Sequence, residues 1–196
     1  MGLSFVKIVA ISPLECRFCA SSIAKVCLIF VLFQTQKSTV MPKITTFLTF
    51  NDQAEEAVNF DTSVFNNSGI VHISRYGEGA PVPQGTVMSV VFRLGGQEFM
   101  ALNGGPHFTF SPGISLFVDC RNQQEVDDLW EKLSDGGEKG PCGWLTDRFG
   151  VSWQIIPAAL DRLLQDKDPA KAQRVMQAIL QMSKIDVAAL EQAGAA

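Results

Sequence analysis

Downstream of residue 41, the spacing of apolar residues switches several times between alternation and helical periodicity. Residues 43–50 alternate and are rich in Thr and Phe, which predicts a strand, and helical spacing follows up to about Phe65. Asp52 with Glu55 three residues later predicts a capping box at the start of this helix. Three further strands are predicted over 70–76, 86–94 and 98–102. Together these segments predict one βαβββ module.

The same order of periods returns in the second half of the chain. A strand is predicted over 114–120, and Asn122 with Glu125 opens a helix whose apolar stripe contains Val126, Leu129, Trp130 and Leu133. Two further strands are predicted over 143–146 and 151–156. The chain therefore predicts an α+β fold of paired βαβββ modules, related by internal duplication.

A helical tail is predicted after Pro157. Asp168 is a capping residue, Pro169 suits the first helical position, and a short last helix follows Asp186. The apolar stripe of the first long tail helix consists of Ala172, Val175, Met176 and Ile179. This stripe either packs on the parent domain or forms the contact of a homodimer.

The first 40 residues are predicted to be an extension outside the domain, with Met41 as the natural start. Their most apolar stretch, 26–33, is too short for a membrane span, which needs about 20 residues. No small-residue cleavage site follows it, so export is not favoured. The Cys16 and Cys19 pair has no second pair and is read as accidental. The predicted organisation is an extension over 1–40, a domain over 41–157 and a helical tail over 158–196.

Composition and charge narrow the classes of partner. The chain is 46% hydrophobic and 18% charged, as expected of a globular protein, and its formal net charge is −4. It has no cluster of Lys and Arg, so nucleic acid is excluded as a partner, and no membrane segment is predicted. Only Cys120 and Cys142 fall in the domain, which favours a reducing compartment, the cytoplasm.

Three motifs carry a resemblance to a known family: FNDQAEEA at 50–57, GQEFMALNGGPHF at 96–108 and CGWLTDRFGVSWQ at 142–154. They resemble the PhnB-like branch of the vicinal oxygen chelate superfamily, which includes glyoxalases, bleomycin resistance proteins and extradiol dioxygenases. The resemblance implies sheets curled around a cavity, homodimers, and in the enzymes a divalent metal held by His, Gln or Glu. Relatives are often labelled 3-demethylubiquinone-9 3-methyltransferase, yet the chain lacks the glycine-rich turn that follows the first parallel strand of usual methyltransferases.

The resemblance also indicates where metal ligands would lie. Gln154 occupies a position where many of the metal enzymes have Glu, and its counterpart in the first module is Met100, a poor ligand for such cations. The first strand of each module offers no imidazole, only Phe47 or Thr49 and Ser115 or Phe117. The two histidines, His72 and His107, fall outside the usual positions. No metal is therefore predicted at the usual site, with Gln154 as the single candidate ligand there.

Several other residues are candidates for a ligand site, each with a structural alternative. His107 and Asn103 lie in a rigid Gly/Pro loop that can present them to a ligand, with His107 as the candidate catalytic residue, or His107 is simply exposed. Cys142 lies beside Trp144 and either lines a cavity or is buried and inert. Asp61 falls in the apolar stripe of its helix, where relatives usually have Tyr. Its carboxylate faces the ligand cavity, finds an Arg or Lys partner, or tilts out to solvent, and local distortion with access to solvent is expected.

Three functions remain open. The first is a metal-free small-molecule-binding protein, with no cofactor, whose pocket is lined by Trp144, Trp153, Phe99 and Phe108, unless these aromatics are plain core. The alternative is a metal-dependent lyase, isomerase or dioxygenase that holds a divalent metal with Gln154, Asp61 and His107. The third is the methyltransferase of the family label.

Overall fold

The computed structural model describes residues 43–195, and Ile44–Ala196 form one compact unit. The predictions for residues 1–40 lie outside the described residues. Over the range 43–195, no helix has the length and apolar character needed to cross a membrane.

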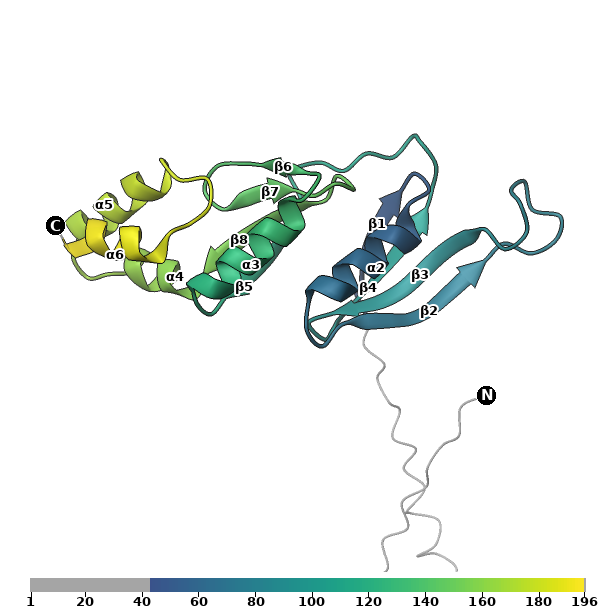
Figure 1. The fold of residues 1–196 in the computed structure, drawn as a ribbon, viewed down its shortest axis with the longest axis horizontal. Coiled ribbons are helices and arrows are strands. Elements are labelled where there is room, and N and C mark those ends of the chain that lie inside the picture. The colour runs from purple at the N-terminus through teal and green to yellow at the C-terminus, as the bar shows by residue number, and fades with distance from the viewer. Residues whose placement is uncertain (1–42, 196) are drawn as a thin grey trace, which may run out of the picture. The chain divides into compact units, whose positions relative to one another are not determined.

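The first module has the predicted order of elements (Figure 1). Its elements are β1 (Thr46–Phe50), α2 (Ala54–Val64), β2 (Gly69–Arg75), β3 (Val87–Leu94) and β4 (Gln97–Asn103). The strands form a sheet in the order β1-β4-β3-β2, in which β1 and β4 are parallel and the other pairs are antiparallel. The strand β1 is therefore an end strand.

The second module repeats this topology. Its elements are β5 (Leu116–Cys120), α3 (Gln123–Ser134), β6 (Glu138–Lys139), β7 (Trp144–Thr146) and β8 (Ser152–Pro157). The sheet order is β5-β8-β7-β6, again with its first and last strands parallel, so β5 is the counterpart of β1. The paired modules predicted from the sequence are confirmed. The strand β6 was missed because two residues are too few to show an alternating pattern.

One face of each sheet carries a helix, with α2 over the first sheet and α3 over the second (Figure 1). Alternate strand residues point to that face, so Leu48 and Phe50 of β1 are buried, whereas Phe47 points to the other face and is 50% exposed. The buried residues of both modules belong to one hydrophobic core, which includes Trp130 of α3 and Trp153 of β8.

The start of α2 differs from the prediction. The capping residue is Gln53, not Asp52, and it makes no side-chain capping bond. Asn103 supplies the cap from the end of β4: its Oδ1 accepts a hydrogen bond from the Ala54 N–H at 2.8 Å. Its Nδ2 donates to the Val87 carbonyl at 3.0 Å. The cap of this helix is therefore a contact between elements distant in sequence.

The start of α3 agrees with the prediction. The Asn122 side chain accepts from the Glu125 N–H at 3.0 Å, and Glu125 accepts from the Arg121 N–H at 2.8 Å. These reciprocal bonds satisfy backbone donors at the helix start.

The tail contains α4 (Ala158–Leu164), α5 (Pro169–Ile179) and α6 (Val187–Ala195). Asp168 caps α5 as predicted, by accepting from the Ala170 N–H at 2.9 Å. Within the predicted stripe of α5, Val175 and Ile179 are buried in a core of tail residues, whereas Met176 is 44% exposed. Backbone bonds fasten the tail to the second module, for example from Gly143 N–H to the Ser183 carbonyl at 2.7 Å.

Candidate ligand-binding site

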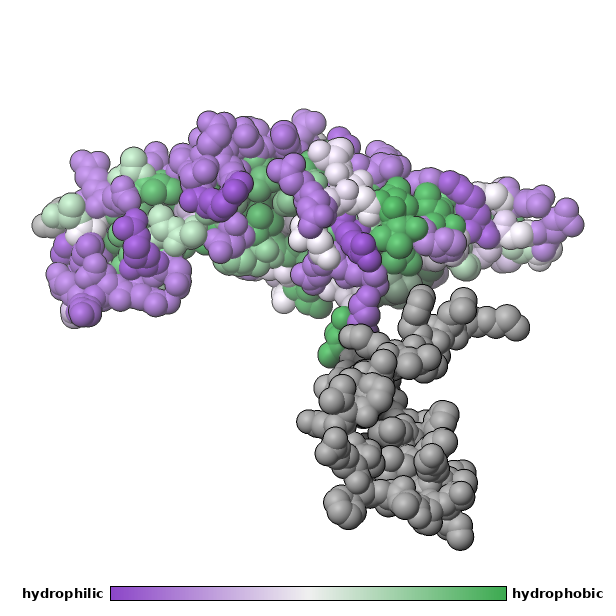
Figure 2. Space-filling view, turned by 90° about the horizontal axis from the view of Figure 1, so that it is seen from below, coloured by the Kyte–Doolittle hydropathy of each residue, from purple (hydrophilic) through white to green (hydrophobic). Residues whose placement is uncertain are grey.

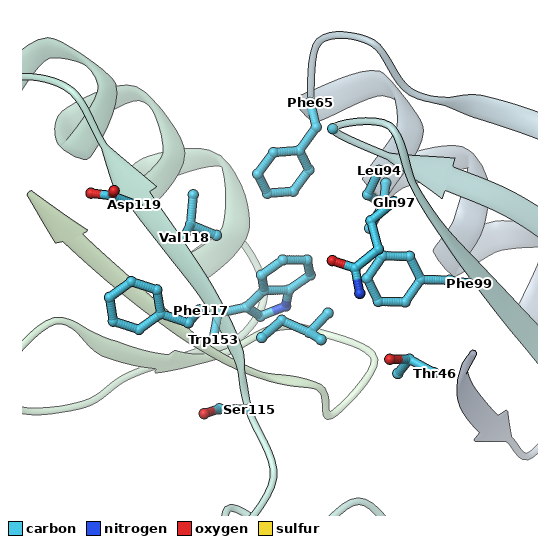
Figure 3. A pocket seen from close by; sticks show the side chains of 12 residues that line it. Thr46, Phe65, Leu94, Gln97, Phe99, Ser115, Phe117, Val118, Asp119 and Trp153 are labelled. Carbon is cyan, nitrogen blue, oxygen red and sulfur yellow. The ribbon is translucent and has the colours of Figure 1, made fainter. Parts of the chain in front are cut away.

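A cavity of about 430 Å³ lies where the two modules meet, and we call it the junction cavity (Figure 3). Both modules contribute to its lining: Thr46, Phe65, Leu94, Gly95, Gln97 and Phe99 from the first, and Ser115, Leu116, Phe117, Val118, Asp119 and Trp153 from the second. Four of these residues are aromatic, and Asp119 is the one charged residue of the lining. The lining contains no Lys, Arg or His, so it offers no counter-charge to an anion.

The aromatic side chains have different orientations around β5. Figure 3 shows Phe65, Phe99 and Trp153 directed toward one space, whereas Phe117 and Asp119 lie on the other side of the strand. Five consecutive residues of the β5 segment, 115–119, line the cavity. The junction cavity therefore follows the outer edge of this end strand, with three aromatic rings as its inner wall.

Trp153 is held in a fixed orientation. Its ring stacks on Phe65 with centroids 5.4 Å apart and an interplanar angle of 20°. Its Nε1–H donates to Asp147 Oδ2 at 2.8 Å. A buried indole with both its ring face and its donor satisfied is a rigid wall for a ligand.

Asp147 organises the turn between β7 and β8. Its Oδ1 accepts from the Phe149 N–H at 2.8 Å and the Val151 N–H at 2.9 Å, in addition to the bond from Trp153. Burial raises the pKa of Asp147, and these hydrogen bonds act in the opposite direction. Sequence reasoning predicted the strands on either side, over 143–146 and 151–156, but not this carboxylate, whose partners are known only once the strands are paired.

The expectation for Asp61 was wrong. Its side chain is not open to solvent but 2% exposed, and Oδ1 has no hydrogen-bond partner. Burial, and secondly the charge of Asp147, raise the pKa of Asp61 to about 8, so the carboxyl is protonated at neutral pH. The α2 helix is regular over this position, so the chain accommodates Asp61 by neutralising it rather than by local distortion.

Arg148 follows Asp147 in the turn, and its guanidinium packs on aromatic rings. The guanidinium carbon is 4.3 Å from the centroid of Phe60 and 5.1 Å from that of Phe149. The two rings are themselves in contact at 5.9 Å and join α2 to the turn of the second module. These are cation–π contacts, which stabilise the junction without ion pairing.

The helix-free faces of the two sheets carry equivalent rows of side chains. In the first sheet, Phe47 pairs with Met100, which pairs with Val91 and then His72. In the second, Phe117 pairs with Gln154, which pairs with Trp144. These rows include the positions at which the resemblance implies metal ligands, and Gln154 Nε2 there donates to Ser115 Oγ at 2.8 Å. Sequence reasoning missed that His72 ends the first row, because its register depends on an irregularity in β2.

Both helix-free faces expose apolar side chains. Phe47 and Phe117, one in each row, are 50% and 60% exposed, and Figure 2 shows hydrophobic residues reaching the surface on the side that it presents. Apolar exposure of this kind is a feature of binding surfaces.

Two of the four aromatics predicted to line one pocket do so, namely Phe99 and Trp153. Trp144 lines a separate cavity beside residues 138–141, and Phe108 borders another and is 56% exposed. The prediction of a single aromatic pocket was therefore wrong for Trp144 and Phe108. Trp144 pairs with Gln154 and therefore lies on the face of the sheet opposite Trp153, and Phe108 lies in the loop after β4.

The remaining predicted residues lie outside the junction cavity. Asn103 caps α2, and His107 is exposed in the loop after β4. Cys142 has a φ of 56°, unusual for a non-glycine residue, and its thiol donates to the Ile179 carbonyl at 3.5 Å. Cys142 thus packs against the tail rather than facing this cavity.

The non-standard metal set of Gln154, Asp61 and His107 is not assembled. Asp61 is enclosed on the helix side of the sheets near Asp147, which bonds to Trp153, whereas Gln154 points to the opposite face of β8. Among residues 43–195, no three His, Cys, Asp or Glu side chains are grouped in a way that could hold a metal ion. Gln154 and Ser115 are the polar pair available to a metal or a ligand on the second helix-free face.

Comparison with known proteins identifies relatives of the whole two-module region. The family model described as 3-demethylubiquinone-9 3-methyltransferase matches residues 42–156. A PhnB protein from Bacillus cereus, whose name carries the same methyltransferase description, is 45% identical, with 60% of this chain and 100% of that chain covered and a TM-score of 0.54.

A second solved structure, protein PA1353 from Pseudomonas aeruginosa, is 22% identical and shares the fold, with 60% of this chain and 98% of that chain covered and a TM-score of 0.51. A glyoxalase/bleomycin resistance protein/dioxygenase domain from Frankia is more distant, at 14% identity, 61% and 93% coverage and a TM-score of 0.37. Among curated proteins, none matches the chain. With the family model and the Bacillus cereus protein both matched over the two modules, the chain belongs to the PhnB-like family that carries the description 3-demethylubiquinone-9 3-methyltransferase.

Proposed function

We propose that the protein binds a flat, uncharged small molecule in the junction cavity and does so without a metal. The observation that carries this proposal is the convergence of Phe65, Phe99 and Trp153 on one space of about 430 Å³ (Figure 3). That volume is within the range of small-molecule sites, which are mostly apolar with a few polar groups. Gln97 and Thr46 are the polar groups that would orient such a ligand.

The proposal is tested with a simple probe, 2-naphthol, by calorimetry. Binding is expected, and Phe65→Leu, which keeps apolar volume but removes the ring, is expected to weaken it by about 2- to 10-fold. Phe108→Leu is the matched control, since Phe108 does not line this cavity. Equal affinities for both variants, or no binding at all, would refute the proposal.

The alternative function is a metal-dependent lyase, isomerase or dioxygenase. Gln154 supports it, because its amide lies on a helix-free face where the resemblance implies a ligand, with Ser115 beside it. Elemental analysis of protein prepared without a metal-binding tag decides between the two. One divalent metal per chain, and a melting temperature that falls with chelator, would establish the enzyme alternative.

The methyltransferase of the family description is the third candidate. The turn that follows β1, residues 51–53, has the sequence Asn-Asp-Gln and contains no glycine. A nucleotide-like cofactor usually approaches the backbone at a glycine-rich turn of this kind. We therefore expect no binding of S-adenosylmethionine in equilibrium dialysis, and saturable binding would reverse this ranking.

We also propose a homodimer, formed through the helix-free faces. Because the two faces are equivalent by internal duplication, a two-fold axis can place the first face of one copy on the second face of its partner. The α5 stripe is the surface suggested by the sequence, but Val175 and Ile179 are buried in the tail core, and exposed Met176 alone is small for a stable interface. Light scattering tests both: Phe117→Glu is expected to give monomers, and Met176→Glu is expected to leave the mass unchanged.

A further inference from the structure

We infer that the ligand is elongated, with a flat ring at one end and an unbranched apolar chain at the other. This inference rests on the proposed binding function and extends it by naming the class of ligand. Its basis is a second cavity of about 370 Å³ that shares Thr46, Ser115 and Leu116 with the junction cavity. Shared walls make the two cavities neighbours in one groove.

The second cavity is apolar. Its lining consists of Thr46, Phe47, Leu48, Thr109, Phe110, Ser111, Ile114, Ser115, Leu116, Val151 and Ser152. It contains no charged residue, and its polar groups are small hydroxyls. The groove therefore changes from a junction cavity with an amide and a carboxylate to a second cavity with aromatic and aliphatic side chains, small hydroxyls and no charge.

The groove is long compared with a single ring. The wall that the second module contributes to the groove follows the β5 segment from Ile114 to Asp119. Residues 115–119 line the junction cavity, and residues 114–116 line the second cavity. Five residue steps of about 3.3 Å give a length of roughly 16 Å. A bicyclic ring fills only part of that length, which leaves room for a chain.

An apolar side chain that lines the second cavity is left open to water outside the rows that the proposed homodimer covers. Ile114, which precedes β5, is 77% exposed. An alkyl chain lying over Ile114 removes both its own surface and that of Ile114 from water, which is the main source of affinity for such a group. A charged head group has no partner of opposite sign except at Asp119, which lies on the outer side of β5.

The test compares 2-naphthol with its straight-chain ethers of four and eight carbons. Affinity is expected to rise with chain length, by up to about fourfold for each methylene that becomes buried. Ile114→Lys is expected to remove most of the gain of the eight-carbon ether while leaving 2-naphthol binding unchanged. Ile44→Lys is the matched control, because Ile44 is 97% exposed and lines neither cavity.

The outcomes separate this inference from the proposed function. Binding of 2-naphthol with no gain from the chain would overturn the elongated ligand and leave the proposed function standing. If Ile114→Lys and Ile44→Lys lose the same share of the affinity gain of the eight-carbon ether, the ether adheres nonspecifically to the protein surface. That result would also overturn the elongated ligand. Light scattering during the titration tests whether a second copy of the chain, rather than a ligand, occupies the second cavity. If the ether dissociates a dimer, a second copy fills this cavity and the inference fails. Absence of binding by any probe would refute the proposed function itself.

Discussion

Replacing Asp61 with asparagine is expected to make the folded protein more stable at high pH than at low pH, relative to the wild type. The carboxyl is 2% exposed, Oδ1 has no partner, and burial with the charge of Asp147 raises its pKa to about 8. In the unfolded chain the same group titrates near 3.8. Between these two values the unfolded chain is ionised and the folded chain is protonated, so folding requires uptake of a proton.

The sign and size of the effect follow from this difference. Wild-type stability falls as pH rises through the window between 3.8 and about 8, and the loss is complete above it. A shift of about four pKa units at 1.36 kcal/mol each gives a loss on the order of 5 kcal/mol, which relaxation of the surroundings reduces. Asparagine does not titrate and has only the constant cost of a buried amide, about 1–3 kcal/mol. The variant is thus expected to equal or fall below the wild type at pH 5 and to exceed it at pH 9.

Urea unfolding at pH 5, 6, 7, 8 and 9 measures this difference, with Asp52→Asn as control because Asp52 is exposed. The free energy of unfolding of Asp61→Asn minus that of wild type should grow with pH and level off above 8, while the control should follow the wild type. A difference that does not change with pH would refute the reasoning and show that Asp61 is ionised and paired in the folded protein.

Three further substitutions test contacts that support the site, and each is measured by the free energy of unfolding. A variant as stable as the wild type would show that the contact or backbone geometry it disturbs does not stabilise the fold. Asn103→Ala removes the cap on the Ala54 N–H and is expected to cost about 1–2 kcal/mol. Trp153→Phe leaves Asp147 without its indole donor, at a cost of about 1–3 kcal/mol, and should weaken 2-naphthol binding. Gly143→Ala places a Cβ at a φ of +81° and 2.9 Å from a backbone oxygen, at a cost of at least about 1 kcal/mol.

The order of helices and strands was predictable because the spacing of apolar residues within each segment indicates its type. Asn122 illustrates this, since its partner Glu125 is three residues away and the cap is visible in the sequence. Asn103 illustrates the limit: it was proposed as a ligand-binding residue, but its partner at Ala54 lies in a different element. A side chain that bonds across the fold cannot be assigned before strand pairing is known.

For the site as well, individual residues could be singled out from the sequence, but their orientation depends on contacts between elements distant in sequence. Trp153 and Gln154 were both singled out, but which of them faces the junction cavity depends on how β8 sits against α3 and β5. Asp61 was recognised as a carboxylate in an apolar stripe, but its neighbour Asp147 is in the other module. Its burial and protonation therefore followed only from the structure.

The cap that Asn103 provides to α2 has a consequence for the order in which the first module folds. Asn103 lies 49 residues after Ala54, at the end of a strand that pairs with both β1 and β3. While the chain is being synthesised, α2 emerges before its capping residue exists, so the first turn of the helix cannot be completed until β4 is in place. The first turn of α2 and the end of β4 should accordingly open together, and their amide hydrogens should exchange at matching rates.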